Sequence, residues 1–236
     1  MLDTADPWVS RSVLLDGTHD PENVDNVIYA LRERGIAPDQ IVDVGANIGT
    51  STLELLSAYP DATAVSIEPH PDNYRLLRQN VIANGLEDRV RTVNVAVGDA
   101  NGTVQLVVSA SNPGDHRVGS PAPGSKIDVP IRRLDELAQP DGATLLWIDV
   151  QGYEGHVFRG AGDFRRCPAL VEFWPFRLHE VGGYAAFLEA VDGYGTVLDA
   201  RNGMRPAGDV DGCAQRLVDE HAAGLDSGYT DLLLLP

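Results

Sequence analysis

The segment Ile41-Val42-Asp43-Val44-Gly45-Ala46-Asn47-Ile48-Gly49 joins a short apolar strand to a turn with two glycines four residues apart. Glycine lets a backbone turn tightly and approach a ligand closely. The next apolar run, residues 63–67, is followed directly by Glu68. A carboxylate in that position can accept hydrogen bonds from both hydroxyls of a ribose. The pattern therefore indicates a nucleoside site at the carboxyl ends of two neighbouring strands.

Strands and helices alternate outward from this segment. The expected strands are residues 41–44, 63–67, 90–97, 144–148, 169–173, 194–198 and 229–235. The expected helices are residues 24–34, 50–59, 71–84, 153–159, 184–191 and 214–222, the first of them capped by residues 20–23. Strands separated by helices predict an α/β fold with a doubly wound, mainly parallel, seven-stranded sheet.

The pattern changes after the third expected strand. Residues 103–108 and 126–131 are β segments with no helix between them, so they predict a small β insertion at about 99–133. The loop that joins them, 109–125, is rich in Ser, Pro and Gly. A loop of that length in a compact domain is usually functional or mobile, and His116 within it could reach the substrate if the loop is a lid.

The bulk composition describes an ordinary globular domain. The chain has 236 residues, 43% of them hydrophobic, which is enough for one core. We expect a helical N-terminal extension over 1–38, which could cover the site or mediate a homodimer, and the main domain over 39–236. No long apolar run and no signal peptide are recognised, so we expect no membrane association and a cytoplasmic location.

The charge of the chain narrows the classes of partner. The formal net charge is −17, which disfavours nucleic acid as a substrate because phosphate backbones are repelled. The two cysteines, Cys167 and Cys213, belong to no metal-binding pattern and are expected to be reduced thiols.

Two cofactor classes use a glycine turn followed by an acidic residue. A nicotinamide site usually has Gly-x-Gly-x-x-Gly, and that spacing is absent here. Asp43, two residues before Gly45, is unfavourable near a pyrophosphate but suits the cationic amino-acid end of S-adenosylmethionine, directly or through water. The alternatives that remain are a nicotinamide-dependent oxidoreductase, a non-catalytic nucleoside-binding module, or a plain structural turn.

Three segments resemble the FkbM family of methyltransferases over roughly residues 40–175. They are residues 42–49, residues 68–71 with Asn80 on the following helix, and Ile148-Asp149-Val150-Gln151-Gly152-Tyr153-Glu154. The family usually has Glu at the position of Gln151 and often Lys at the position of Trp147. Its members are class I enzymes with a Rossmann-like fold, mostly O-methyltransferases of natural products, sugars and glycolipids.

The resemblance implies a set of residues that bind S-adenosylmethionine. The set is Asp43, Gly45, Ala46, Asn47, Gly49, Thr50, Glu68, Pro69, Asn94, Ala96, Val97 and Asp149. Within it, the glycine loop is expected to hold the methionine portion, Glu68 the ribose, and residues 94–97 the adenine. Asp149 is expected to face the transferred methyl group.

Methyl transfer to an alcohol needs an aligned nucleophile and removal of its proton. Asp149 is the first candidate for the base, although it could instead cap the helix near Tyr153. His156 is the second candidate, because imidazole titrates near neutrality. Glu172 ends the adjacent strand, and with Asp149 it could share a proton or hold Mg²⁺. Glu154 is expected either to interact with the helix dipole or to contact the substrate.

The acceptor side carries an aromatic cluster, Trp174, Phe176 and Tyr184, which predicts either core packing or an apolar wall for the acceptor. His70 is expected to shape the nucleoside pocket. The predicted function is S-adenosylmethionine-dependent O-methylation of a hydroxyl on a small-molecule acceptor, such as a polyketide, a sugar or another natural product. Methylation of a nitrogen or a carboxylate stays open.

Overall fold

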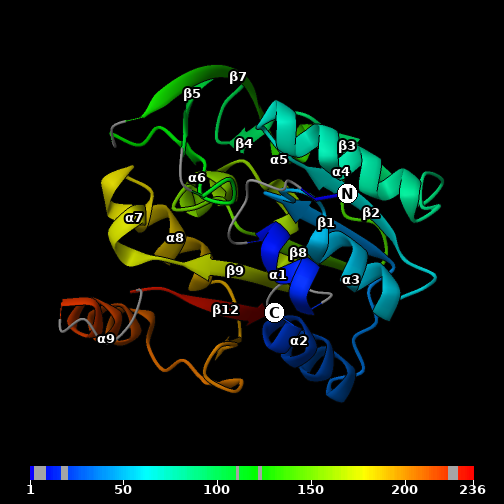
Figure 1. Cartoon of the computed structure of the whole chain (residues 1–236). Coiled ribbons are helices and arrows are strands. Elements are labelled where there is room, and N and C mark those ends of the chain that lie inside the picture. The colour runs from blue at the N-terminus through cyan, green and yellow to red at the C-terminus, as the bar shows by residue number, and fades with distance from the viewer. Residues whose placement is uncertain (3–8, 17–20, 110–111, 122–123, 223–227) are drawn as a thin grey trace.

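The computed structural model describes residues 1–2, 9–16, 21–109, 112–121, 124–222 and 228–236 (Figure 1). Its centre is an eight-stranded sheet with the strand order β11-β10-β12-β9-β8-β1-β2-β3. The parallel strands are β1 (Gln40–Val44), β2 (Thr63–Ile67), β3 (Val90–Val93), β8 (Thr144–Ile148) and β9 (Ala169–Phe173). The remaining strands are β12 (Thr230–Leu235), antiparallel to both β9 and β10 (Thr196–Asp199), and β11 (Arg205–Pro206) at the edge.

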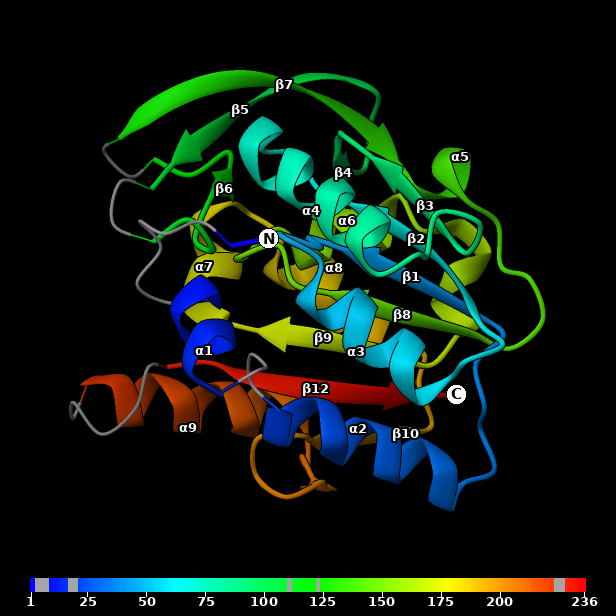
Figure 2. The ribbon, with the colours of Figure 1, turned by 45° about the vertical axis from the view of Figure 1, so that its right-hand side comes forward.

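Helices cover both faces of this sheet. One face carries α2 (Pro21–Glu33), α3 (Thr50–Ala58) and α4 (Pro71–Ala83), and the other carries α6 (Glu154–Arg159), α8 (Tyr184–Val191) and α9 (Val210–Ala222) (Figure 2). Shorter pieces are α1 (Val9–Asp16), α5 (Leu134–Leu137), the 3₁₀ turn Gly162–Arg166 and α7 (Pro175–Glu180). No helix in the described ranges is both long and apolar enough to cross a lipid bilayer.

The molecule has one hydrophobic core on each face of the main sheet, because successive side chains of a strand point to opposite faces. In β1, Val42 and Val44 face the layer of α6, α8 and α9, while Ile41 faces the layer of α2, α3 and α4. All three side chains are at most 1% exposed. Strands buried on both faces are nearly continuous apolar runs, as in parallel sheets generally.

The N-terminal region packs onto the same domain. Val27 and Leu31 of α2 are fully buried in the core that contains Ile41. Val9 of α1 packs against Ile48, in the loop after β1. The helix α2 begins three residues before the start expected from the sequence, and Asp20 of its expected cap lies outside the described residues.

A second, four-stranded sheet has the order β4-β7-β5-β6 and lies beyond β3 at one edge of the molecule (Figures 1 and 2). Its strands are β4 (Ala96–Gly98), β5 (Gly102–Val108), β6 (Arg117–Val118) and β7 (Ser125–Arg133). The two β segments predicted on either side of residue 109 are its antiparallel pair β5 and β7.

Two expectations about strands were wrong. The main sheet has eight strands rather than seven, because the two-residue edge strand β11 carries no recognisable pattern. The third strand is not continuous over residues 90–97: β3 stays in the main sheet, while β4 pairs with β7 in the second. Asn94 lies at the break, and its side-chain amide donates hydrogen bonds to backbone carbonyls of Glu68 and Pro69.

Candidate functional site

Two adjoining cavities open where β1 and β8 end. Including their open mouths, the first measures about 520 Å³ and the second about 1360 Å³. The residues that line both are Gly45, Asn47, Gly114, Asp149 and Gln151. A ligand in the first cavity would therefore meet a ligand in the second beside Asp149.

The loop after β1 owes its shape to backbone conformations that favour glycine. Gly45 and Gly49 have φ angles of 90° and 93°, and Asn47 between them has 51°. A Cβ atom on Gly45 would lie 1.8 Å from the carbonyl oxygen of Asp149. Gly45 thus allows a close approach between the ends of β1 and β8, and the two strand ends form one floor for both cavities.

Glu68 lines the first cavity and is held by backbone amides. Its two carboxylate oxygens accept hydrogen bonds from the N–H groups of Asn47 at 3.0 Å and His70 at 2.7 Å. The side chain is 5% exposed, and burial raises its pKa to about 7. The bonds from Asn94 fix the backbone at Glu68 and Pro69. Asn94 therefore supports the cavity wall rather than lining it, which corrects its expected contact with a cofactor.

The remainder of the first cavity is largely apolar. Its lining includes Pro69, Val95, Ala96, Val97 and Tyr153. Val95 and Tyr153 were not singled out from the sequence, although Val95 lies inside the stretch expected to flank an adenine. An apolar wall beside a carboxylate suits a nucleoside, because the base packs against the wall while the sugar hydroxyls donate to the carboxylate.

The loop of the second sheet closes over this cavity. Pro113 and His116 both line it, and the side chain of Asn73 on α4 donates to the Pro113 carbonyl at 2.9 Å. The His116 ring lies 4.2 Å from that of His70, and burial, with a smaller effect of His70, lowers the pKa of His116 to about 4. Of the loop predicted over 109–125, residues 110–111 and 122–123 lie outside the described part of the chain.

Asp43 lies beneath the glycine loop, fully buried, and lines neither cavity. One carboxylate oxygen accepts hydrogen bonds from the hydroxyls of Ser51 at 2.6 Å and Thr52 at 2.5 Å. Its other oxygen, Oδ1, is buried without a partner among the described residues, and burial raises the pKa of Asp43 to about 6. The structure therefore corrects the expectation of a direct contact with a cofactor, and leaves contact through water.

The loop residues Ala46 and Thr50, by contrast, line the second cavity, and Gly49 precedes Thr50 at the start of α3. A Cβ atom on Gly49 would lie 2.7 Å from the side chain of Leu77 on α4. The absence of a side chain at Gly49 thus allows the start of α3 to pack closely against α4.

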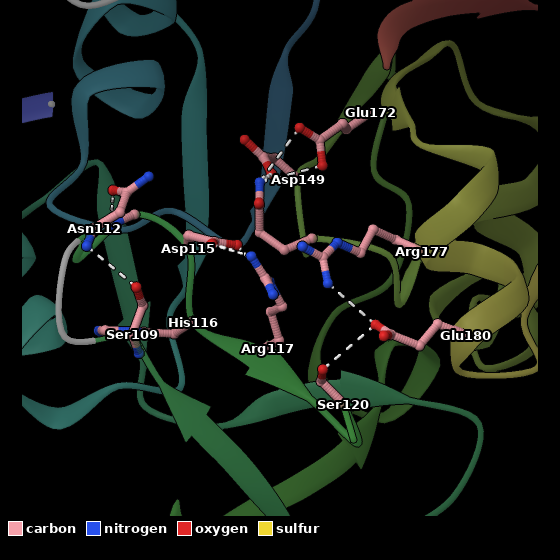
Figure 3. A network of polar contacts seen from close by, with 12 residues as sticks. Ser109, Asn112, Asp115, His116, Arg117, Ser120, Asp149, Glu172, Arg177 and Glu180 are labelled. Atoms are coloured by element: carbon pink, nitrogen blue, oxygen red, sulfur yellow. Dashed lines mark hydrogen bonds and ion pairs between the residues drawn. The ribbon is translucent and has the colours of Figure 1, made fainter. Parts of the chain in front are cut away.

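A bridge of hydrogen bonds joins two carboxylates at the junction of the cavities (Figure 3). The amide nitrogen of Gln151 donates to Asp149 at 2.7 Å and to both oxygens of Glu172, at 3.2 and 3.3 Å. Gln151 has a φ angle of 56°, which turns its side chain back toward β8 and β9. Burial raises the pKa of Glu172 well above its ordinary value, and the negative charges of Asp149, Glu154 and Asp231 raise it further.

Glu154 is fully buried and lines neither cavity. One of its oxygens accepts hydrogen bonds from the backbone N–H groups of Val150 at 3.2 Å and Gly152 at 3.0 Å. Burial raises its pKa to about 8. Of the roles expected for Glu154, contact with a substrate is excluded, because the side chain instead holds the turn that carries Gln151.

His156 lies outside the site, which corrects its expected role as a base. Its Nδ1 atom pairs with Asp99 at 3.0 Å, and its Nε2 atom contacts the Val181 carbonyl at 3.1 Å. The ring stacks on Tyr153, which lines the first cavity, whereas His156 itself lines neither. Both nitrogens are therefore engaged in joining α6 to its neighbours.

The pair Asp149 and Glu172 does not fit Mg²⁺. A cation that bridged the two carboxylates would lie between them and would need further oxygen ligands around it. The Gln151 amide, a hydrogen-bond donor, occupies that place instead. Within the ranges that the structure describes, no group of three or more His, Cys, Asp or Glu side chains could hold a metal ion.

The second cavity has a wall that the sequence revealed only in part. Trp174 lines it together with Tyr229, and their rings lie 5.4 Å apart. Phe176 is instead exposed, and Tyr184 packs against Phe173, so neither of them forms the wall. The other polar residues that sequence reasoning missed here are Asn23, Ser51, Asn112, Asp115, Arg201 and Asp231. The one available signal was an aspartate, Asp231, inside an otherwise apolar strand.

Chemically, the site combines a nucleoside-sized cavity, ending in a carboxylate, with a wider cavity whose floor is acidic. The fit of the first cavity to S-adenosylmethionine rests on Glu68, on the apolar wall, and on the unsatisfied Oδ1 of Asp43 beneath the loop. Asp149 lines both cavities, so its negative charge lies where they meet, beside the place that a cationic sulfonium would occupy.

Comparison with known proteins finds methyltransferases. The family model of the methyltransferase FkbM domain matches residues 43–194. Methyltransferase sdnD of Sordaria araneosa is 28% identical over 159 residues, and Methyltransferase 1 of Beauveria bassiana (strain ARSEF 2860) is 26% identical over 146 residues. Each alignment covers 52% of this chain, and the chain spans 60% and 58% of the length of these relatives.

Among solved structures, the crystal structure of a methyltransferase FkbM from Methylobacillus flagellatus KT is 17% identical, with a TM-score of 0.44. That match covers 63% of this chain and 36% of the other. The match to the family model begins at Asp43 and includes Glu68, Asp149 and Glu172. The chain belongs to the FkbM methyltransferase domain family.

Proposed function

We propose that the chain is an S-adenosylmethionine-dependent O-methyltransferase that acts on a hydroxyl of a small-molecule acceptor, a natural product or a sugar. One observation carries the proposal: the nucleoside-sized cavity and the wider cavity meet at Asp149. A group-transfer enzyme needs its donor and acceptor sites in contact at a residue that can manage a proton.

The first cavity would hold the methyl donor. Glu68 would accept from the ribose hydroxyls, Pro69 and residues 95–97 would contact the adenine, and the loop of Gly45 to Asn47 would surround the amino-acid end. Bound there, S-adenosylmethionine supplies a methyl group on a positively charged sulfur, which is a good leaving group.

The chain's own residues would align the acceptor and take its proton. Asp149 borders both cavities, so an acceptor hydroxyl in the second cavity can donate to it. The bond from Gln151 to Oδ1 of Asp149 holds the carboxylate in place at the junction of the two cavities. Pro113 lines the first cavity and Gly114 lines both, so this loop would shield the junction from water.

Isothermal titration with S-adenosylhomocysteine, S-adenosylmethionine and NAD tests the donor. We expect binding of both adenosyl compounds and none of NAD. Binding of NAD alone would overturn the proposal and favour a nicotinamide-dependent oxidoreductase.

A screen of hydroxyl-bearing acceptors for release of S-adenosylhomocysteine tests the chemistry. With an acceptor that supports turnover, Asp149→Asn should lower kcat by about 100-fold or more while S-adenosylhomocysteine still binds. Asp88→Asn is a matched control, because it makes the same change at an exposed carboxylate outside both cavities. Full activity of the Asp149 variant would remove Asp149 as the base.

A further inference from the structure

The floor of the second cavity is a set of hydrogen-bond acceptors, and it suggests what kind of acceptor molecule binds. Glu172 on β9 lies opposite Asp231 on β12 in the register of the two strands. Asp149 follows the neighbouring strand β8, and the Gln151 amide joins it to Glu172. Three carboxylates from three adjacent strands therefore meet at one end of the sheet.

The strong donors around this floor are already engaged. Gln151 donates to Asp149 and Glu172, and Arg201 donates to Asp231 at 2.5 Å. The side-chain amide of Asn23 donates to Asp231 at 2.8 Å. A ligand that reaches the floor therefore meets three carboxylates, with the guanidinium of Arg201 lining the same cavity.

A second feature of the same cavity also requires a donor. Asn23 lines the cavity and is 6% exposed, and its Oδ1 atom is buried without a partner among the described residues. A buried amide oxygen without a donor is costly to the protein unless a ligand or water supplies one.

The charges and the aromatic wall favour a positive group. Burial raises the pKa of Glu172, and the negative charges of Asp149, Glu154 and Asp231 raise it further while Arg201 lowers it. A positive group bound beside Glu172 would therefore favour its ionised form. Guanidinium groups already lie over both rings of the wall, Arg177 over Trp174 at 4.7 Å and Arg201 over Tyr229 at 4.8 Å. Aromatic faces attract cations, and they also pack well against the C–H faces of a sugar ring.

We infer that the second cavity binds an amino sugar, whose ammonium group pairs with Glu172 and Asp231 while its hydroxyls donate to Asp149 and Asn23. The inference rests on the proposed function, since it names the acceptor class for the same site. Acceptors that carry a carboxylate or phosphate are rejected, because such a group would meet Asp149 and Glu172.

Three monosaccharides with the same ring test the charge preference: glucosamine, glucose and glucuronic acid. Their binding to the full chain is measured by saturation-transfer NMR at saturating S-adenosylhomocysteine, below the pKa of the amine. We expect glucosamine to bind about tenfold more tightly than glucose, which corresponds to one charge-assisted hydrogen bond, and glucuronic acid to bind least. Equal binding of glucosamine and glucose, no binding of either, or a preference for glucuronic acid overturns the inference.

A pair of isosteric variants locates the preference. Glu172→Gln should abolish the advantage of glucosamine over glucose, while Glu87→Gln, which removes an exposed carboxylate elsewhere, should keep it. An advantage that survives in Glu172→Gln contradicts the assignment, and if this variant does not fold the comparison of the three sugars still decides.

Binding of S-adenosylhomocysteine distinguishes a failure of the proposed function from a failure of the amino-sugar inference. If wild-type protein does not bind it, the proposed function fails. If it binds but glucosamine has no advantage, only the amino-sugar inference fails.

Discussion

Gly45 is the residue where one added carbon atom would disturb the site most. Its φ angle is 90°, and a Cβ atom would overlap the carbonyl oxygen of Asp149 at 1.8 Å. Gly45→Ala should therefore lower the free energy of unfolding by more than about 3 kcal/mol, since it adds a steric overlap to the backbone strain. Urea denaturation measures the loss, and titration with S-adenosylhomocysteine should show weakened binding.

Gly35 supplies the matched control for Gly45. Its φ angle is also positive, 68°, but a Cβ atom there would meet nothing within 4 Å. Gly35→Ala should cost only about 1 kcal/mol, from backbone strain alone. Equal losses in the two variants would show that the contact between Gly45 and Asp149 carries no energy of its own.

Glu68 should make donor binding depend on pH. Because burial raises its pKa to about 7, the carboxylate is largely protonated at pH 6 and largely ionised at pH 8. The ionised form accepts more hydrogen bonds, so the affinity for S-adenosylhomocysteine should rise as the pH rises from 6 to 8. Titrations across this range measure the effect.

The variant Glu68→Gln tests the same carboxylate without a change of pH. Its amide NH₂ would face a backbone N–H of Asn47 or His70, so one hydrogen bond is lost. We expect affinity at least about tenfold lower and a flat pH profile. A variant that keeps the wild-type pH profile would assign that profile to another group, for which buried Asp43 is the first candidate.

The position of a residue relative to a strand end was predictable, but its orientation was not. Glu68 and Asp149 were expected at the site because each follows a buried strand, and both line a cavity. Asp43 was expected at the site from its place before the glycine loop, yet it lies under that loop. His156 was expected there because imidazole titrates near neutrality, yet it bonds to Asp99. Local sequence does not contain the partners, Ser51 and Asp99, that decide these orientations.

At the scale of elements, strands buried on both faces were the most predictable. The limits of β2, β8 and β9 match the expected ones residue for residue, because apolar runs bounded by turns are unambiguous there. Elements defined by long-range pairing were missed or misplaced. The strand β6 has only two residues. The strand β4 leaves the main sheet to pair with β7, and this pairing was not predictable because β7 lies in a later segment of the chain.

The loop of the second sheet should control how long the donor stays bound. Its described contact with α4 is the bond from Asn73 to the Pro113 carbonyl, and Asn73 is 6% exposed. Asn73→Ala should loosen the loop and raise the dissociation rate of S-adenosylhomocysteine several-fold, because Pro113 and Gly114 line the donor cavity. Stopped-flow displacement measures the rate, and hydrogen exchange should increase over residues 112–120.

Asn84 offers the control for this element. Its side chain donates to the Asn80 carbonyl at the end of the same helix, away from the loop. Asn84→Ala should lower stability slightly and leave the dissociation rate unchanged. An unchanged rate in Asn73→Ala as well would mean that the loop does not limit release.

At the scale of the whole molecule, the domain concentrates its buried acids at one end of the sheet. Asp43, Glu68, Glu154 and Glu172 all lie in or after strands β1, β2, β8 and β9, and burial is the largest cause of each raised pKa. The net charge of −17 alone did not reveal this arrangement, since most acidic residues are spread over the surface. A cationic donor and a cationic acceptor would both be stabilised there, which links the proposed function to the inferred amino sugar.

The same buried acids should make the ligand-free protein less stable at alkaline pH. Glu68 and Glu154 have folded pKa values of about 7 and 8, above the ordinary 4.5, so their stabilising effect is complete below pH 4.5 and is lost as the pH rises through the folded values. His116 acts in the opposite direction, because its folded pKa of about 4 lies below 6.5, but that contribution is constant above pH 6.5. The free energy of unfolding should therefore fall between pH 6.5 and pH 8.5, by at most about 1.4 kcal/mol per unit of pH for each group that is still below its folded pKa. The decline should level off once the pH exceeds both folded values.

Glu154→Gln, which keeps the accepting oxygen for Val150 and Gly152, should flatten the decline, whereas the exposed Glu87→Gln should not. Thermal and urea unfolding at the two pH values decide the matter, and a stability that is constant or rises over this range would show that these carboxyls are ionised in the folded protein at neutral pH.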